Sequence, residues 1–199
     1  MSSSPTAFRQ GPPLAEPGGL RALTAQFPFP GRLDAIWVRS ERRGAMRALG
    51  EAQAEVGRGL LGDHRSSRLR SGPERRAREI SLIQAEHMPL LARWVGLDHL
   101  DAGALRRNLV ISGINLLSLR SPFADNRLVW QLGDEVLLQV TGPCDPCSRM
   151  ETLRGPGGYN AMRGHGGLTA MLLRGGRLKI GDQLKPAGQA TTGENDDHD

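Results

Sequence analysis

The main constraint on the fold is a series of short apolar stretches separated by glycine-rich turns. Alternating apolar and polar residues are typical of β-strands, and helical spacing is confined to brief segments between them. This order predicts a mainly β fold, a closed or nearly closed β-barrel with a few short inserted helices, rather than a βαβ sheet. The expected strands are residues 32–39, 78–84, 109–111, 128–132, 135–140, 168–173 and 177–180, and the expected helical segments are 42–58, 86–95, 101–105, 148–153 and 159–163.

The chain of 199 residues divides into three parts by composition. Residues 1–30 are rich in Ser, Pro, Gly and Ala and predict an extended N-terminal arm. Residues 31–185 hold the strand pattern and are long enough to bury a hydrophobic core of their own. Residues 186–199 are polar and end in acidic residues, so we expect a disordered tail. The expected organisation is one barrel domain between two irregular ends.

The net charge of +5 limits the classes of partner. A basic chain can bind nucleic acid, but aromatic residues make up only 4% of this one and its arginines are dispersed. A small anionic ligand or a solvated surface therefore fits better than nucleic acid. The sequence shows neither a signal peptide nor a long apolar run, so no membrane contact is expected. We expect a cytoplasmic protein whose cysteines stay reduced.

Both cysteines, Cys144 and Cys147, lie in one polar stretch at the end of an expected strand. Pro143 and Pro146 remove two backbone N–H donors and stiffen this turn. Arg149 stands two residues beyond Cys147, and a nearby cation favours the thiolate, the form that attacks, carries sulfur or binds metal. We expect any chemistry of the protein at this corner.

Three interpretations of this cysteine pair compete on the residues alone. A zinc half-site needs a second pair of ligands, and no two of the five histidines have metal-ligand spacing. A thioredoxin-like redox pair opens a helix after a βαβ strand, whereas this pair follows barrel strands and contains a proline. Packing as two small apolar side chains is the default for buried cysteines, but the surroundings here are polar and rich in proline.

Eight short segments of the chain occur in a recognisable order. They are residues 59–65 (GLLGDHR), 78–84 (REISLIQ), 106–110 (RRNLV), 112–116 (SGINL), 133–134 (GD), 146–149 (PCSR), 164–167 (GHGG) and 176–182 (GRLKIGD). As an ordered set they resemble the MOSC domain, the C-terminal sulfur-carrier domain of molybdenum cofactor sulfurases, which also occurs by itself in small bacterial proteins. The resemblance covers residues 31–182, and the set is more specific than any single segment.

The resemblance implies a MOSC-type β-barrel with a pocket for the molybdenum cofactor (molybdopterin). Cys147 aligns with the cysteine that acts as sulfur carrier or molybdenum ligand. Cys144 stands where some members have a second cysteine, which implies that it protects or resolves a persulfide on Cys147. The family's Arg-x-Asn cofactor contact maps to Arg106 and Asn108. A guanidinium binds phosphate bidentately, and an amide matches the mixed donors and acceptors of a pterin.

Further polar residues are expected to contact the anionic cofactor, namely Arg107, Arg149, Arg163, His165, Asp63 and His64. Arg163 and His165 lie in a glycine-rich loop that should face the cysteine corner, and binding residues often lie on loops. Structural alternatives remain open for the others. Arg106 and Arg107 could cap a helix C-terminus, and Asp63 and His64 could close a turn through their own backbone.

Three functions follow from this sequence. In the first, a stand-alone MOSC protein binds molybdenum through Cys147 and, as the resemblance implies, reduces N-hydroxylated or N-oxygenated small molecules with electrons from a redox partner. In the second, Cys147 carries sulfur from a cysteine desulfurase to a metal-sulfur cluster; no pyridoxal phosphate is expected in this chain. In the third, a non-catalytic basic barrel binds a small anion or RNA.

Overall fold

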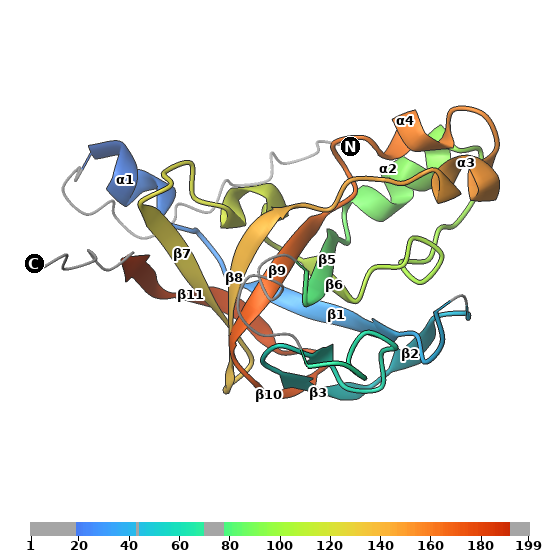
Figure 1. Cartoon of the computed structure of the whole chain (residues 1–199). Coiled ribbons are helices and arrows are strands. Elements are labelled where there is room, and N and C mark those ends of the chain that lie inside the picture. The colour runs from blue at the N-terminus through green and yellow to red at the C-terminus, as the bar shows by residue number, and fades with distance from the viewer. Residues whose placement is uncertain (1–18, 43, 70–77, 192–199) are drawn as a thin grey trace, which may run out of the picture.

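The computed structural model describes residues 19–42, 44–69 and 78–191. Over these residues the protein is mainly β with a few short helices, as the sequence predicts (Figure 1). The strands are β1 (Gly31–Val38), β2 (Arg47–Leu49), β3 (Glu51–Glu55), β4 (Gly59–Leu60), β5 (Ile80–Gln84), β6 (Leu109–Ser112), β7 (Asn126–Leu132), β8 (Val136–Pro143), β9 (Leu168–Arg174), β10 (Gly176–Lys179) and β11 (Gln183–Thr191). The helices are α1 (Gly19–Thr24), α2 (His87–Trp94), the 3-10 helix η2 (Leu116–Leu119), α3 (Arg149–Arg154) and α4 (Gly158–Met162).

Seven strands of the described chain close into a barrel in the order β1-β11-β7-β8-β9-β5-β6, and β6 pairs again with β1 (Figure 1). The neighbours are antiparallel except β5 and β6, which are parallel. Their connection contains α2, because a parallel pair needs a long crossover. β2 extends the sheet beside β1, and β10, β3 and β4 form a separate small sheet.

Two apolar clusters stabilise this arrangement. The barrel interior is filled by aliphatic side chains and by Trp130, which is fully buried and donates its indole N–H to the Leu119 carbonyl (3.0 Å). A second cluster lies between the outer face of β5 and β6 and the helices α2, α3 and α4, and it includes Leu91, Met150 and Met162. The helices therefore cover one side of the barrel, and the loop that contains the cysteines runs between them and the strands (Figure 1).

The segment 42–58 does not form the helix that its apolar spacing predicts. Ala52 and Ala54 of β3 are buried, whereas Glu51 and Gln53 are exposed, so the burial period is two rather than 3.6. Pairing with β10 and β4 on both sides favours the strand over the helix. The helical turn expected over residues 101–105 is also wrong, since this segment forms turns only.

The two ends of the domain also differ from the expectation. Residues 19–24 of the expected extended arm form α1, where Arg21 makes an ion pair with Asp125 (3.0 Å). Residues 186–191 of the expected tail continue β11 along β7, with a register shift between Pro186 and Gly188 that accommodates a residue without an N–H. Strand pairing with β7 therefore makes this segment part of the sheet, although its composition is that of a tail. Residues 1–18 and 192–199 lie outside the described part.

Candidate functional site

The two cysteines lie in the loop that joins β8 to α3, and the fold holds them differently. Cys144 is buried, and its N–H donates to the Gly167 carbonyl (2.8 Å). Cys147 is exposed, and its carbonyl accepts from the N–H of Met150 at the start of α3 (2.8 Å). The Cys147 thiol is therefore accessible to a ligand, whereas Cys144 is fixed in the wall of the site.

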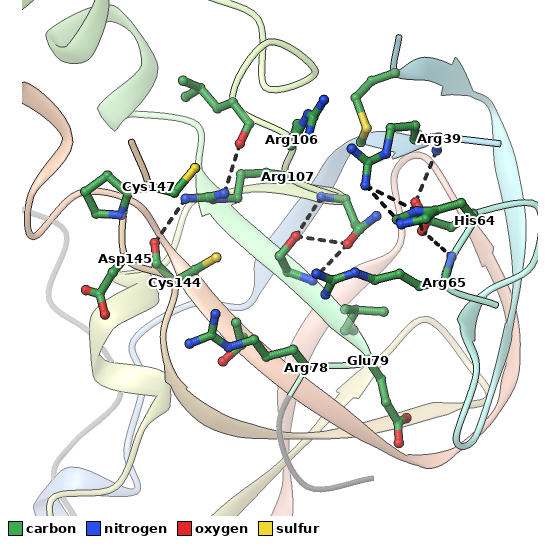
Figure 2. Close-up of a pocket in the computed structure, with 18 of the residues that line it drawn as sticks. Arg39, His64, Arg65, Arg78, Glu79, Arg106, Arg107, Cys144, Asp145 and Cys147 are labelled. Carbon is green, nitrogen blue, oxygen red and sulfur yellow. Dashed lines mark hydrogen bonds and ion pairs between the residues drawn. The ribbon is translucent and has the colours of Figure 1, made fainter. Parts of the chain in front are cut away.

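Arg107 is a buried cation behind this loop (Figure 2). Its Nε donates to the Gly166 carbonyl (2.6 Å) and its Nη1 to the Leu105 carbonyl (2.9 Å). Its Nη2 donates to the Cys144 carbonyl (3.0 Å). Such charge-assisted bonds are stronger than neutral ones. Arg107 thus joins three segments that are far apart in the sequence and positions the cysteine loop, a role that differs from the helix cap and the cofactor contact that the sequence suggests.

On the opposite side, Asp63 is the centre of a hydrogen-bonded turn. Its carboxylate accepts from the backbone N–H of Arg39 (3.1 Å) and of Arg65 (3.0 Å). The His64 ring lies with Nδ1 3.1 Å from Oδ1 of Asp63 and Nε2 3.2 Å from Nη2 of Arg39. Nδ1 is also 3.2 Å from the same Nη2. A neutral ring with its proton on Nδ1 donates to the carboxylate and leaves the lone pair of Nε2 for the guanidinium. Asp63 and His64 therefore close a turn and line the pocket at once.

The environment of His64 favours the neutral ring. Burial lowers the pKa of His64 below its ordinary value, and the nearby charge of Arg39 lowers it further, while Asp63 opposes both effects. This direction agrees with the geometry, because a doubly protonated ring has no lone pair to accept from Arg39.

The cysteine loop and the Asp63 turn enclose one pocket, with a volume of about 260 Å³. Cys147 and Cys144 lie on one side, and Arg39, His64 and Arg65 lie on the other (Figure 2). Arginines dominate the charged lining, which consists of Arg39, Arg65, Arg78, Arg106 and Arg107 with the acidic residues Asp63, Glu79 and Asp145. Because Glu79 points away from the others and accepts from the backbone N–H of Leu172 (2.9 Å), the pocket favours an anion.

Arg106 and Asn108, to which the family resemblance assigns cofactor contacts, both line this pocket. Arg106 has a φ of 57°, a left-handed conformation that no other non-glycine residue of the described chain adopts and that is often found at functional sites. The Asn108 amide holds the wall together. Its oxygen accepts from the N–H (3.1 Å) and hydroxyl (2.9 Å) of Ser81, and its nitrogen donates to the Trp37 carbonyl (3.1 Å). Asn108 thus positions β5 against β1.

Arg163 and His165 do not line the cysteine pocket. Arg163 is exposed at the end of α4. The His165 ring packs edge to face against His87, with ring centroids 4.8 Å apart, and against Trp94, at 5.1 Å. The glycine-rich loop that holds both residues does face the cysteine corner as expected, because the Gly167 carbonyl accepts from the N–H of Cys144. The two side chains do not line the pocket, so their contact with an anionic ligand stays a prediction. Arg149 begins α3, and its side chain lies outside the described part of the structure.

Sequence reasoning misses three arginines of the pocket, Arg39, Arg65 and Arg78. Two of them had a signal, because Arg65 ends and Arg78 begins segments that resemble the MOSC family. Arg39 follows β1 directly, outside every such segment, and only the barrel closure brings it to His64.

Among the residues that the structure describes, no three His, Cys, Asp or Glu side chains come together as ligands for a metal ion. Likewise, among residues 19–42, 44–69 and 78–191, no helix has the length and apolar character that crossing a bilayer requires.

Together, fold and site describe a closed β-barrel with a thiol and several arginines in one pocket. Residues 62–185, more than half of the chain, match the MOSC domain. The chain therefore belongs to the MOSC domain family. None of the curated proteins matches it.

Several solved structures share this fold. The YuaD protein from Bacillus subtilis is 18% identical with a TM-score of 0.62, over 78% of this chain and 94% of that one. YiiM from Geobacillus stearothermophilus is 18% identical with a TM-score of 0.58, over 79% and 75%. YiiM from Escherichia coli is 18% identical with a TM-score of 0.55, over 80% and 71%. At this level of identity the likeness concerns the fold alone.

Proposed function

We propose that this MOSC protein binds the molybdenum cofactor in the cysteine pocket and reduces N-hydroxylated or N-oxygenated compounds with electrons from a separate redox protein. One observation carries the proposal: an exposed thiol, Cys147, and five arginines line the same pocket. Membership of the MOSC family supports it, because the family is associated with this cofactor.

The side chains of the pocket fit the chemistry of the cofactor. Its pterin carries a phosphate, and guanidinium groups match phosphate oxygens in charge and in bidentate geometry. Arg39, Arg65, Arg78 and Arg106 are the residues that would bind the phosphate, since three of the five N–H donors of Arg107 already bind backbone carbonyls. A thiolate is the soft ligand that the metal end requires, and Cys147 is the exposed thiol.

When bound, the cofactor supplies two-electron redox chemistry at molybdenum. For an N-hydroxylated substrate the N–O bond breaks, the oxygen leaves as water, and the reaction consumes two electrons and two protons. The electrons come from the redox partner. Arg107 and the Gly167 carbonyl hold the loop that carries Cys147, so the thiol keeps its place at the mouth of the pocket. Because Cys147 is exposed, water can deliver the protons there.

A test is to produce the protein in a host that makes molybdenum cofactor and to measure metal and releasable pterin. We expect near-equimolar molybdenum and pterin in the wild type and loss of metal in Cys147→Ala. Cys144→Ala is the matched control, because Cys144 lies buried three residues away, and it should retain metal. Equal molybdenum in wild type and Cys147→Ala would contradict the assignment of this ligand. Turnover with NADH and the purified protein alone would exclude the need for a redox partner.

A sulfur carrier is the second candidate, and the exposure of Cys147 favours it as well. A carrier thiol must reach a desulfurase, accept its sulfane sulfur as a persulfide while the donor thiolate is released, and then reach the acceptor. Persulfide-specific labelling after incubation with a cysteine desulfurase and cysteine separates the two functions. A stable persulfide on Cys147 in protein that binds no molybdenum would favour the carrier.

A further inference from the structure

Helix α2 is apolar on two sides, and only one of them is covered. Leu91 and Ala92 are buried in the second apolar cluster. Leu90 and Trp94 lie one helical turn apart on the outer side, where they are 37% and 51% exposed. Side chains at this spacing lie on the same side of a helix, so the two residues form one exposed apolar stripe.

Helix α4 extends this exposed surface. It contacts α2, and the ring of His165, just beyond its end, packs against Trp94 with ring centroids 5.1 Å apart. Tyr159 and Arg163 are likewise one turn apart and exposed, whereas Met162 is buried. The two helices thus present a common surface, here called the α2–α4 face, which consists of Leu90, Arg93, Trp94, Tyr159 and Arg163.

The residue types of the α2–α4 face are those of protein–protein interfaces. Trp, Tyr and Arg are enriched at the centres of interfaces and contribute most of their binding energy. This chain has only three tryptophans and one tyrosine. Trp130 is fully buried and Trp37 is partly buried, so Trp94 is the exposed tryptophan, and it lies on the same face as Tyr159. A protein partner accounts for both exposed aromatic side chains.

The charges available on the α2–α4 face are positive. Arg93 and Arg163 form no ion pair with any residue that the structure describes. The acids of the neighbouring helices bind backbone instead, since Glu86 accepts from one N–H (2.7 Å) and Glu151 from two (2.9 and 3.2 Å). Asp98, after the end of α2, lines a different pocket. Charge complementarity therefore favours an acidic partner.

The α2–α4 face lies beside the loop that carries the cysteines. The His165 ring contacts Trp94, and two residues further along the chain the Gly167 carbonyl accepts from the N–H of Cys144 (2.8 Å). Helix α3, which packs against α4, begins two residues after Cys147. Figure 1 shows α2, α3 and α4 gathered at one end of the molecule and α1 at the other. A protein bound to this face is thus held next to the thiol site.

We propose that the α2–α4 face is the docking surface of an acidic electron-transfer protein. Its role as electron donor rests on the proposed function, whereas the surface and its preference for an acidic protein do not. For each N–O bond reduced, the partner gives up two electrons in all, and two protons from water complete the water molecule that leaves. A small face is sufficient, because electron-transfer complexes are weak and bury little surface.

The test measures by calorimetry, at low ionic strength, how a plant-type ferredoxin, an acidic carrier, binds to the full chain produced without molybdenum. The wild type should bind it about tenfold or more tightly than it binds cytochrome c, a basic carrier. Leu90→Ala/Arg93→Glu should weaken ferredoxin binding by about tenfold or more. The matched control is Leu117→Ala/Arg120→Glu, which makes the same changes at the same spacing on exposed residues near α1, and it should bind as the wild type does.

Three outcomes of these titrations would overturn the docking surface. They are equal affinity for the acidic and the basic carrier, undiminished ferredoxin binding by Leu90→Ala/Arg93→Glu, and an equal loss in the control variant. Trp94→Ala is a second variant that changes no charge, and it should weaken ferredoxin binding by a similar factor. Undiminished binding by Trp94→Ala would also overturn the assignment.

Activity of the molybdenum-loaded protein separates this proposal from the proposed function. Reduced methyl viologen is a small electron donor that needs no docking surface. Leu90→Ala/Arg93→Glu should keep the wild-type rate with the viologen and lose about tenfold or more with low concentrations of ferredoxin. An equal loss with both donors would overturn the docking role. A wild type inactive with the viologen would contradict the proposed function and leave the titrations unaffected.

Discussion

The two walls of the cysteine pocket are built on opposite principles. On the thiol side a buried cation, Arg107, donates to three backbone carbonyls. On the facing side a carboxylate, Asp63, accepts from two backbone N–H groups and from the His64 ring. Neither wall is a regular helix or strand, so each needs such a group to satisfy its backbone. Some charged side chains of the pocket, such as Arg107 and Asp63, thus bind the backbone of its walls, and the others are available to bind a ligand.

The largest effect is expected from breaking the thiol wall with Arg107→Met. This change leaves three carbonyls without their charged donor, and we expect the free energy of unfolding to fall by about 3 kcal/mol or more. The released loop should also expose Cys144, so its reaction with a thiol reagent should approach the rate of Cys147. Denaturant unfolding and timed thiol labelling measure both.

Arg93→Met serves as control for Arg107→Met, because Arg93 is an exposed arginine on α2. It should change neither stability nor labelling. If Arg107→Met left Cys144 as protected as in the wild type, the positioning role of the guanidinium would be wrong.

A smaller effect on the same wall is expected from Gly166→Ala. A Cβ at this position would lie 2.1 Å from the Cys144 carbonyl oxygen and 3.2 Å from Nη2 of Arg107, so the loop must move. Overpacking of this kind costs about 1–3 kcal/mol. Gly142→Ala, in the adjacent strand, is the matched control, since a Cβ there meets nothing within 4 Å. Unfolding midpoints that fall equally in both variants would point to a general glycine effect rather than to this contact.

The facing wall is tested by Asp63→Asn. The amide can still accept at one oxygen, but the charge and the second acceptor are lost, so we expect a loss of about 1–2 kcal/mol of stability. The labelling of Cys144 should stay slow, because Arg107 rather than Asp63 holds the cysteine loop. Fast labelling of Cys144 in Asp63→Asn would show that the two walls are not independent.

The sequence predicts the barrel better than the walls of its pocket. Strands such as β7 and β10 are predicted from the sequence, and their burial repeats every two residues, as a strand with one buried face requires. The prediction fails for the segment that contains β3. Its alanines and glycines give a weak apolar pattern, and pairing with β10 makes it a strand. Long-range pairing of this kind is absent from a local window.

The candidate site divides in the same way. Cys147 and Arg106 lie in segments that resemble the MOSC family, and both residues line the pocket. The role of Arg107 depends on carbonyls up to 59 positions away, and no local pattern reports that. The loop of His165 reaches the cysteines, as the sequence predicts, but through the backbone of Gly167, while the His165 ring packs against Trp94.

The smallest expected effect concerns pH and the charge on His64. Because burial and Arg39 lower its folded pKa, the unfolded chain takes up a proton first as the pH falls below about 6.5. Stability is therefore lost as the pH falls from this value through the folded pKa, with a slope below about 1.4 kcal/mol per pH unit. His64→Gln should remove this contribution to the slope between pH 7 and pH 5.

His87 provides the comparison for His64, because burial and then the neighbouring His165 also lower its pKa. His87→Gln should flatten the same pH range of the stability curve, yet it lies outside the cysteine pocket. Only His64→Gln should therefore also weaken the binding of inorganic phosphate to the pocket, since the neutral ring orients the Arg39 guanidinium. Equal phosphate affinities in the two variants would mean that His64 stabilises its turn without shaping the anion site.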